Sequence, residues 1–231
     1  MYSKHLIERP KIQRNFFNFL YVFVFSCVFF LSFISCSEDE VVYDIGEYKV
    51  DLATVGQNDD NQFFLLDNNI SLLNSNNNNA LESGQRILLN YSFLPEKSIE
   101  YDHVIKVNAI SAITQGKLSE VSQTSIDTIP NDPIYLESVW IGSHYLNICF
   151  YINYHSHKHS IFLITDKEKT TNESISIYFR HDANNDPPGY MRKIIASFDL
   201  SNVLGKPDGR RELIVNINSD NYEGEDYQFK F

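Results

Sequence analysis

Residues 145–154 decide the fold, and they read "YLNICFYINY". Every second residue of this stretch is a large apolar one, and such period-two alternation is the signal of a half-buried β-strand. We therefore expect one face of this strand to point into a hydrophobic core, through Leu146, Ile148, Phe150 and Ile152. Asn147 and Asn153 are expected to face outward.

Six further runs of the same kind follow the turn residues on either side of this strand. They are "IYLESVW", "SIFLIT", "SISIYFR", "KIIASFDL", "ELIVNIN" and "YQFKF". Seven such runs within residues 132–231 predict a two-sheet β-sandwich. Trp140 is the only tryptophan, and it has no disulfide beside it. An antibody-type core is thereby excluded, although an immunoglobulin-like topology is not.

A second group of strand-like runs lies upstream, in residues 45–118. "EYKVDLATV", "QFFLLD", "ISLL", "GQRILLNYSF" and "YDHVIKVNAI" alternate and are separated by Asn, Asp and Gly turns. These runs predict a separate, all-β domain. Residues 119–131 lie within "SEVSQTSIDTIPNDP", which is rich in Ser, Thr and Pro and does not alternate. We expect this segment to be the linker between the two domains.

The first 35 residues have the pattern of an export leader. Four basic residues and one acid precede "FFNFLYVFVFSCVFFLSFIS", which carries no charge. A basic lead, an apolar middle and a small residue before the break are typical of a secretory signal. "FISC" at 33–36 resembles the lipobox of bacterial lipoproteins, which implies removal of residues 1–35 and acylation of Cys36. Acyl chains would then hold the protein at a membrane without spanning it.

The residues after Cys36 indicate where the protein goes. Residues 36–44 are expected to form an acidic tether, which begins with Ser37, Glu38, Asp39 and Glu40. A lipidated cysteine followed by such residues resembles the signal that sends Bacteroidetes lipoproteins to the outer face of the outer membrane. The alternative is an ordinary solvated tether. The predicted location is the outer membrane, with the protein facing the cell exterior.

Charge and cysteine usage exclude several classes of protein. Removal of residues 1–35 changes the net charge from −11 to −14, and such an acidic protein is poorly suited to bind nucleic acid. Of the three cysteines, only Cys149 remains in the folded part. An internal disulfide is therefore impossible, and Cys149 is expected to be a small, half-buried filler.

Several words of the sequence resemble a known family. They are "GQRILLNYS" (84–92), "DPIYLESVWIGSHYLNICF" (132–150), "HSIFLI" (159–164), "FRHDANNDPPGY" (179–190) and "SFDLS" (197–201). In this order they resemble the NigD-like family of Bacteroidetes lipoproteins. The resemblance implies an OB-like barrel followed by a β-sandwich. It carries over no activity and no catalytic residue. The family takes its name from a bacteriocin gene cluster, which makes an immunity-like role one alternative.

Histidines alternate in "YHSHKH", at His155, His157 and His159. On one face of a strand they could share a zinc or copper ion, with His181 or Asp182 as a further ligand. A metal-binding or metal-dependent site is thus an alternative function. The other interpretation is a polar hairpin tip, where Lys158 disfavours a cation, and no cofactor is expected.

A second polar cluster, "RHDANNDPPGY", allows one catalytic interpretation. His181 with Asp182 or Asp186 could form a base and its orienting carboxylate. However, no motif places a nucleophile, and Asp and Asn in such a segment commonly cap turns. We therefore expect no catalytic residues and no enzyme activity.

The sequence as a whole predicts a non-enzymatic binding or accessory module. An OB-like barrel raises the question of oligomer binding, and a protein or carbohydrate partner remains possible. Thr128 lies in "DTI", which resembles the short O-glycosylation motif of exported Bacteroidetes proteins. It is a further candidate for modification.

Overall fold

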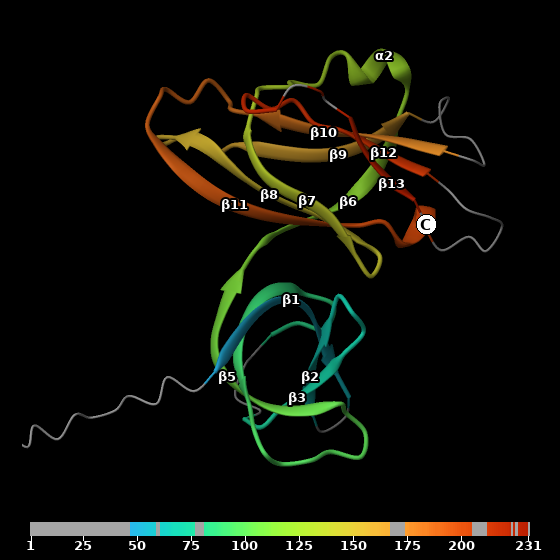
Figure 1. Cartoon of the computed structure of the whole chain (residues 1–231). Coiled ribbons are helices and arrows are strands. Elements are labelled where there is room, and N and C mark those ends of the chain that lie inside the picture. Colours follow the sequence, from blue (N-terminus) through green and yellow to red (C-terminus); the bar gives the residue numbers. More distant parts are fainter. Residues whose placement is uncertain are drawn as a thin grey trace, which may run out of the picture. The chain divides into compact units, whose positions relative to one another are not determined.

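The structure is a computed structural model, and it describes residues 47–58, 61–76, 81–166, 174–204, 212–222, 224 and 226–230. All of them lie within one compact unit, Gly46–Phe231. Strands dominate the described residues, as the alternation predicts (Figure 1). None of the helices among these residues has the length and apolar character needed to cross a membrane.

The first five strands form a closed barrel in the order β1-β2-β3-β5-β4. Their bounds are β1 Tyr48–Gln57, β2 Gln62–Leu66, β3 Ser71–Asn74, β4 Arg86–Phe93 and β5 His103–Ala112. The β3–β5 pair is parallel and the other pairs are antiparallel. Alternate residues fill the interior, chiefly Val55, Phe64, Leu72, Ile87, Leu89 and Ile105. The barrel confirms the predicted OB-like domain.

The remaining strands form an eight-stranded sheet in the order β13-β12-β10-β9-β6-β11-β8-β7. Their bounds are β6 Thr114–Val121, β7 Tyr135–Gly142, β8 Tyr145–Tyr154, β9 Ser160–Asp166, β10 Ser174–Asp182, β11 Tyr190–Asp199, β12 Glu212–Asn216 and β13 Asp226–Lys230. Two short helices, α2 Gln123–Ile126 and α3 Ser201–Leu204, complete the described elements. Each of the seven runs predicted in residues 132–231 is a strand.

Strand β6 folds this sheet into a sandwich because it changes partner half-way along. Thr114–Lys117 pairs with β11, whereas Leu118–Val121 pairs with β9. The two halves of the sheet then enclose one core, which includes Leu146, Ile148, Phe150 and Ile152 of β8. The four apolar residues of the deciding stretch therefore lie where the alternation places them.

Two sequence expectations differ from the structure. The segment 119–131 was expected to be a linker, but its first residues complete β6 and its middle forms α2. The long-range pairing of β6 with β9 and β11 makes it part of the sandwich. Asn147 does face away from the sandwich core, yet it is 0% exposed because Arg86 and Asp67 cover it. Asn153 is exposed, as expected.

Candidate functional site

Several predicted site residues lie outside the described residues. These are Cys36 and the acidic residues after it, Ser37, Glu38, Asp39 and Glu40. Thr128 is described and exposed, and its hydroxyl donates a hydrogen bond to the carbonyl of Ser125 at 2.8 Å. Its modification stays a prediction.

The structure does not assemble the four histidines that were predicted as metal ligands. His155 and His157 lie beyond the end of β8, in the loop before β9, and both are exposed. They therefore do not line one face of a strand. Among the described residues, no group of three or more His, Cys, Asp or Glu side chains is arranged to hold a metal ion.

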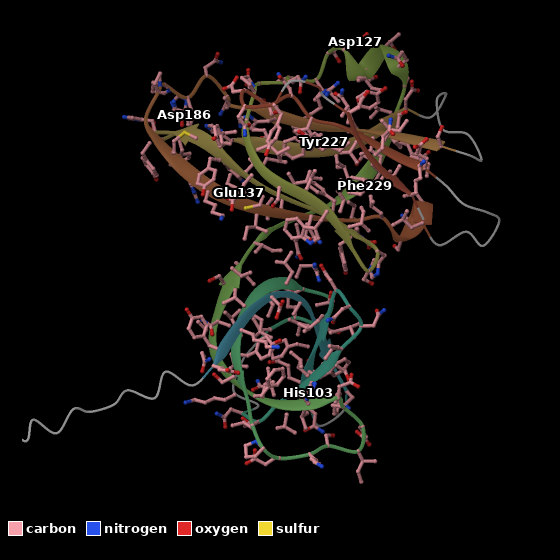
Figure 2. All side chains as sticks on the ribbon, viewed as in Figure 1. His103, Asp127, Glu137, Asp186, Tyr227 and Phe229 are labelled. Atoms are coloured by element: carbon pink, nitrogen blue, oxygen red, sulfur yellow. The ribbon has the colours of Figure 1, made fainter. Side chains whose placement is uncertain are left out.

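Asp186 explains why the histidine loop bends. Its carboxylate accepts hydrogen bonds from the backbone N–H groups of His155, Ser156 and His157, at 2.7–2.9 Å for the shortest of each. The Asp186 side chain is 0% exposed, and Figure 2 labels it at one end of the sandwich. Burial alone would raise its pKa, but these hydrogen bonds and one from His159 outweigh burial and lower the pKa well below its usual range.

The other two histidines meet beside Asp186. Nδ1 of His159 lies 2.8 Å from Nε2 of His181, and Nε2 of His159 lies 3.2 Å from the Asp186 carboxylate. At the far end, Nδ1 of His181 lies 3.2 Å from the carbonyl oxygen of Asp132. The side chain of His159 is 3% exposed. We call this set, Asp132–His181–His159–Asp186, the histidine chain.

Hydrogen-bond donors can be counted along the histidine chain. The carboxylate and the carbonyl at its two ends can only accept, so the ring nitrogen facing each must carry a proton. The contact between the rings needs one proton more. All three hydrogen bonds are therefore made when the two imidazoles share three protons, one more than two neutral rings carry. The added positive charge would face the Asp186 carboxylate.

Burial sets the preference between the two rings. It lowers the pKa of His181, and the neighbouring His159 lowers it further, while the carbonyl of Asp132 acts in the opposite direction. An extra proton is therefore disfavoured on His181.

The predicted base–orienter pair is not formed as expected. The ring of His181 bonds another ring and a carbonyl rather than Asp182 or Asp186. Asp182 instead accepts the N–H of Asn184 at 2.8 Å, which is a turn-capping contact. Among the described residues, the hydrogen-bond partners of His181 include no hydroxyl or thiol that it could activate. The arrangement orders two loops and offers no nucleophile.

An open cleft of about 450 Å³ adjoins the histidine chain at the edge of the sandwich. We call it the edge cleft. Its lining includes Ile152 and Tyr154 of β8, Lys158 and His159 of the following loop, Phe162 of β9, and Arg192 and Ile194 of β11. Neither Lys158 nor Arg192 forms an ion pair with any carboxylate that the structure describes. Apolar walls with unpaired cations suit a ligand that is partly apolar and negatively charged.

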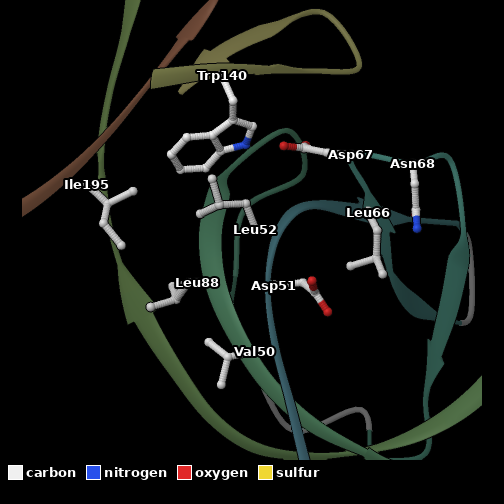
Figure 3. A pocket seen from close by; sticks show the side chains of 9 residues that line it. All are labelled: Val50, Asp51, Leu52, Leu66, Asp67, Asn68, Leu88, Trp140 and Ile195. Carbon is white, nitrogen blue, oxygen red and sulfur yellow. The ribbon is translucent and has the colours of Figure 1, made fainter. Parts of the chain in front are cut away.

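A second cavity, of about 310 Å³, is lined by the barrel residues Val50, Asp51, Leu52, Leu66, Asp67, Asn68 and Leu88, and by Trp140 and Ile195. Figure 3 shows the Trp140 indole beside Leu52, with the Asp67 carboxylate nearby. Both carboxylates already have partners, because Tyr91 donates to Asp51 and Arg86 pairs with Asp67. Burial and Asp51 together raise the pKa of Tyr91 well above its usual range. This cavity therefore offers few free polar groups to a ligand.

Arg86 is the centre of a buried cluster that the sequence did not reveal. Its side chain is 2% exposed and lies 2.7 Å from the Asp67 carboxylate. It also donates to Thr54, Asn147 and Ser197, and its guanidinium stacks over the ring of Tyr145 at 4.1 Å. Every neighbour is a strand or turn residue within the same compact unit. This set, the Arg86 cluster, has a structural role.

Cys149 lies on the face of β8 away from the sandwich core and is 5% exposed. Its thiol lies 3.5 Å from Glu137, and burial raises its pKa. A raised thiol pKa makes a poor nucleophile, which agrees with the expected filler role.

Comparisons with known proteins agree with this geometry. Residues 52–113 match the family described as the NigD-like N-terminal OB domain, and residues 117–231 match the NigD-like C-terminal beta sandwich domain. The chain belongs to the NigD-like family. The two matches meet next to β6, which the second one largely includes. A comparison with curated proteins finds no match.

Three solved structures share the fold of this NigD-like chain. A putative toxin related protein from Parabacteroides distasonis is 25% identical, with a TM-score of 0.68 over 80% of this chain and 93% of its own. A NigD-like immunity protein from Bacteroides caccae is 19% identical, with a TM-score of 0.59 over 80% and 97%. A putative lipoprotein from Bacteroides fragilis is 10% identical, with a TM-score of 0.57 over 80% and 96%.

Proposed function

We propose that this NigD-like chain is a lipid-anchored, non-enzymatic binding module of the bacterial cell surface. The edge cleft carries the proposal, because it combines an open apolar lining with two unpaired cations, Lys158 and Arg192. Among the described residues, the hydrogen-bond partners within the histidine chain beside it include no nucleophile, so the arrangement favours binding over catalysis. The partner contacts the cleft while acyl chains on Cys36 hold the protein at the outer membrane.

The description of the Bacteroides fragilis relative as a putative lipoprotein supports the anchor. Mass spectrometry of the purified protein should find an N-terminal acylated Cys36 and no residues 1–35. Proteinase K added to intact cells should remove the protein, whereas a periplasmic marker survives. An unmodified chain that still begins at Met1 would overturn the anchor, and full protection from the protease would overturn the outward orientation.

Binding at the cleft can be tested in whole cells. Phe162 lines the cleft and is 43% exposed, so a photo-reactive phenylalanine derivative fits there without disturbing the core. Irradiation should produce an adduct of higher mass. The matched control carries the same derivative at Phe93, which lies on the barrel and is 40% exposed. Adducts at neither position, or equally at both, would contradict a binding role for the cleft.

The description of the Bacteroides caccae relative as an immunity protein favours a second candidate, immunity to a bacteriocin. Deletion of the gene should then make the producing strain sensitive to its own culture supernatant, and Arg192→Glu should do the same if the cleft is involved. Unchanged growth after deletion would remove this candidate and leave the binding module in place.

A further inference from the structure

The edge cleft lies between two strand edges that β6 leaves open. Tyr190–Asp199 of β11 pairs along its whole length with β8, but only Ala196–Asp199 also pairs with β6. Likewise, β9 pairs with β6 only from Leu163 onward. In the described part of the chain, Tyr190–Ile195 and Ser160–Phe162 therefore have a strand partner on one side only. Such edges present unpaired N–H and C=O groups that can accept another strand.

The open part of β11 is long enough to recognise a peptide. Six residues of a strand span about 20 Å at roughly 3.3 Å per residue. Arg192 and Ile194 both line the cleft, because alternate residues of a strand share a face. In an added strand, one side chain would thus lie next to the Arg192 guanidinium. The side chain two positions further along would pack against Ile194. This edge is therefore suited to recognise a segment in which a charged residue and an apolar residue lie two positions apart.

The charge of the cleft selects the sign of that charged residue. Lys158 and Arg192 stand out on a chain whose net charge is −11. The Arg192 guanidinium lies 4.7 Å from the centroid of the Tyr154 ring, which holds it in place while its edge stays available for a carboxylate. His159 also lines the cleft. A carboxylate is the complementary group.

The rim of the cleft adds exposed apolar surface. Phe162 is 43% exposed, and Tyr190, which shares a face of β11 with Arg192 and Ile194, is 60% exposed. The Tyr190 and Tyr154 rings meet edge to face, with centroids 5.8 Å apart. Large apolar side chains grouped on an exposed rim are typical of a surface that a partner covers.

From these observations we propose that the edge cleft binds an extended acidic peptide segment of another protein, which adds as a strand to the open edge of β11. The peptide alternates so that a carboxylate meets Arg192 and an apolar side chain meets Ile194. Main-chain hydrogen bonds to Tyr190–Ile195 supply affinity, and the side-chain pattern supplies specificity. This inference rests on the proposed function, for which it names the class of partner.

A synthetic peptide panel tests the proposal on the full chain purified in detergent. The probe is a fluorescently labelled peptide, Thr-Glu-Thr-Val-Thr-Glu-Thr, capped at both ends, in which Glu and Val alternate on one face of the strand. Its first control replaces both Glu with Lys, and its second replaces the central Val with Pro, which cannot donate to a ladder. The acidic peptide should bind at least about tenfold more tightly than either control, as charge complementarity and strand pairing require. Equal binding of all three peptides would overturn the proposal.

A pair of charge-reversal variants locates the site. Arg192→Glu should weaken the acidic peptide by about tenfold or more and improve binding of the Lys peptide. Lys106→Glu is the matched control, since Lys106 is an exposed cation on β5 of the barrel. It should leave both affinities unchanged. Equal losses in the two variants would mean that only overall charge matters, and this result would also overturn the proposal.

Amide hydrogen exchange distinguishes strand addition from simple charge attraction. On binding, N–H groups of Tyr190–Ile195 that point away from β8 should exchange more slowly, whereas those of the paired stretch Ala196–Asp199 should not change. Unchanged exchange at the open edge would refute strand addition. If photo-crosslinks form at Phe162 in cells but the acidic peptide does not suppress them, the peptide proposal fails while the binding function stands.

Discussion

Arg86 and His159 lie at the centres of two buried polar clusters that are built in different ways. The Arg86 cluster pairs a permanent cation with a carboxylate and adds neutral partners from three strands, β1, β8 and β11. The histidine chain is buried too, but it is built from two imidazole rings that contact each other, a carbonyl and a carboxylate. A guanidinium stays protonated at any pH a protein normally meets, whereas imidazole titrates near neutrality.

The difference separates two uses of buried polarity. The contribution of the Arg86 cluster depends on whether all its members are present. The histidine chain includes His181, whose pKa is lowered by burial, and it adjoins the edge cleft through His159. The Arg86 cluster therefore acts as a fixed connection between strands. The stabilisation that the histidine chain provides changes with pH.

Removal of Arg86 should have the largest effect. Arg86→Met keeps much of the apolar volume, but it leaves Asp67 without its counter-ion and removes one of the two donors to Asn147. We expect a loss of about 3 kcal/mol in the free energy of unfolding, the usual cost of breaking a buried pair from one side. Urea denaturation measures it. Arg86→Lys keeps the charge but not the forked geometry. Its free energy of unfolding should therefore lie between those of the parent and of Arg86→Met. If the free energy of unfolding of Arg86→Met lies within about 0.5 kcal/mol of that of the parent, the Arg86 cluster does not hold the strands together.

The second-largest effect is expected in the pH dependence of stability. Folding lowers the pKa of His181, so the unfolded chain binds more protons below the ordinary histidine value of about 6.5. The contribution of His181 is therefore complete above that pH and is lost as the pH falls through the lowered pKa. Asp186 acts in the same direction at lower pH, because its pKa is lowered too. Melting temperatures measured from pH 7.5 to 4.5 should fall accordingly.

A variant isolates this contribution from that of other acids. Asn at position 181 can still donate to the carbonyl of Asp132 but does not titrate, so His181→Asn should give a flatter curve below pH 6.5 than the parent. The charged and titratable neighbours His159, Asp182, Asp186 and Lys158 remain in both proteins. If the melting temperatures of the two proteins fall in parallel below pH 6.5, His181 does not cause this pH dependence.

The fold could be predicted from the sequence wherever a strand has one apolar face. The stretch 145–154 shows this best, since its alternation alone places four core residues. Strand β6 could not be predicted, because "TQGKLSEV" has no apolar face and its burial pattern is mostly exposed. Its strand form depends on parallel pairing with β9 and β11, which lie far away in the sequence. Local composition therefore indicates a linker from residue 119 onward and leaves residues 114–118 with the barrel domain.

The site was less predictable than the fold for the same reason. Spacing grouped His155, His157 and His159, but β8 ends at Tyr154 because Asp186 binds the backbone that follows. His159 and His181 are 22 residues apart in the sequence, and no local pattern predicts their contact. The only sequence signal for the Arg86 cluster is a cation at the start of the apolar run "RILL". Its partners are 19 to 111 residues away.

The smallest effect is expected at an ion pair that lacks burial, which sharpens the comparison. Lys193 lies 2.8 Å from Glu137, but the two side chains are 46% and 41% exposed. Lys193→Gln should leave the melting temperature unchanged within error, because water replaces the lost partner. The hydrogen bond from Lys193 is nevertheless the main cause that lowers the pKa of Glu137. Carboxyl NMR titration should therefore show that pKa rising toward its ordinary value in the variant. If the variant instead melts as early as Arg86→Met, burial cannot be what distinguishes the Arg86 cluster from a surface pair.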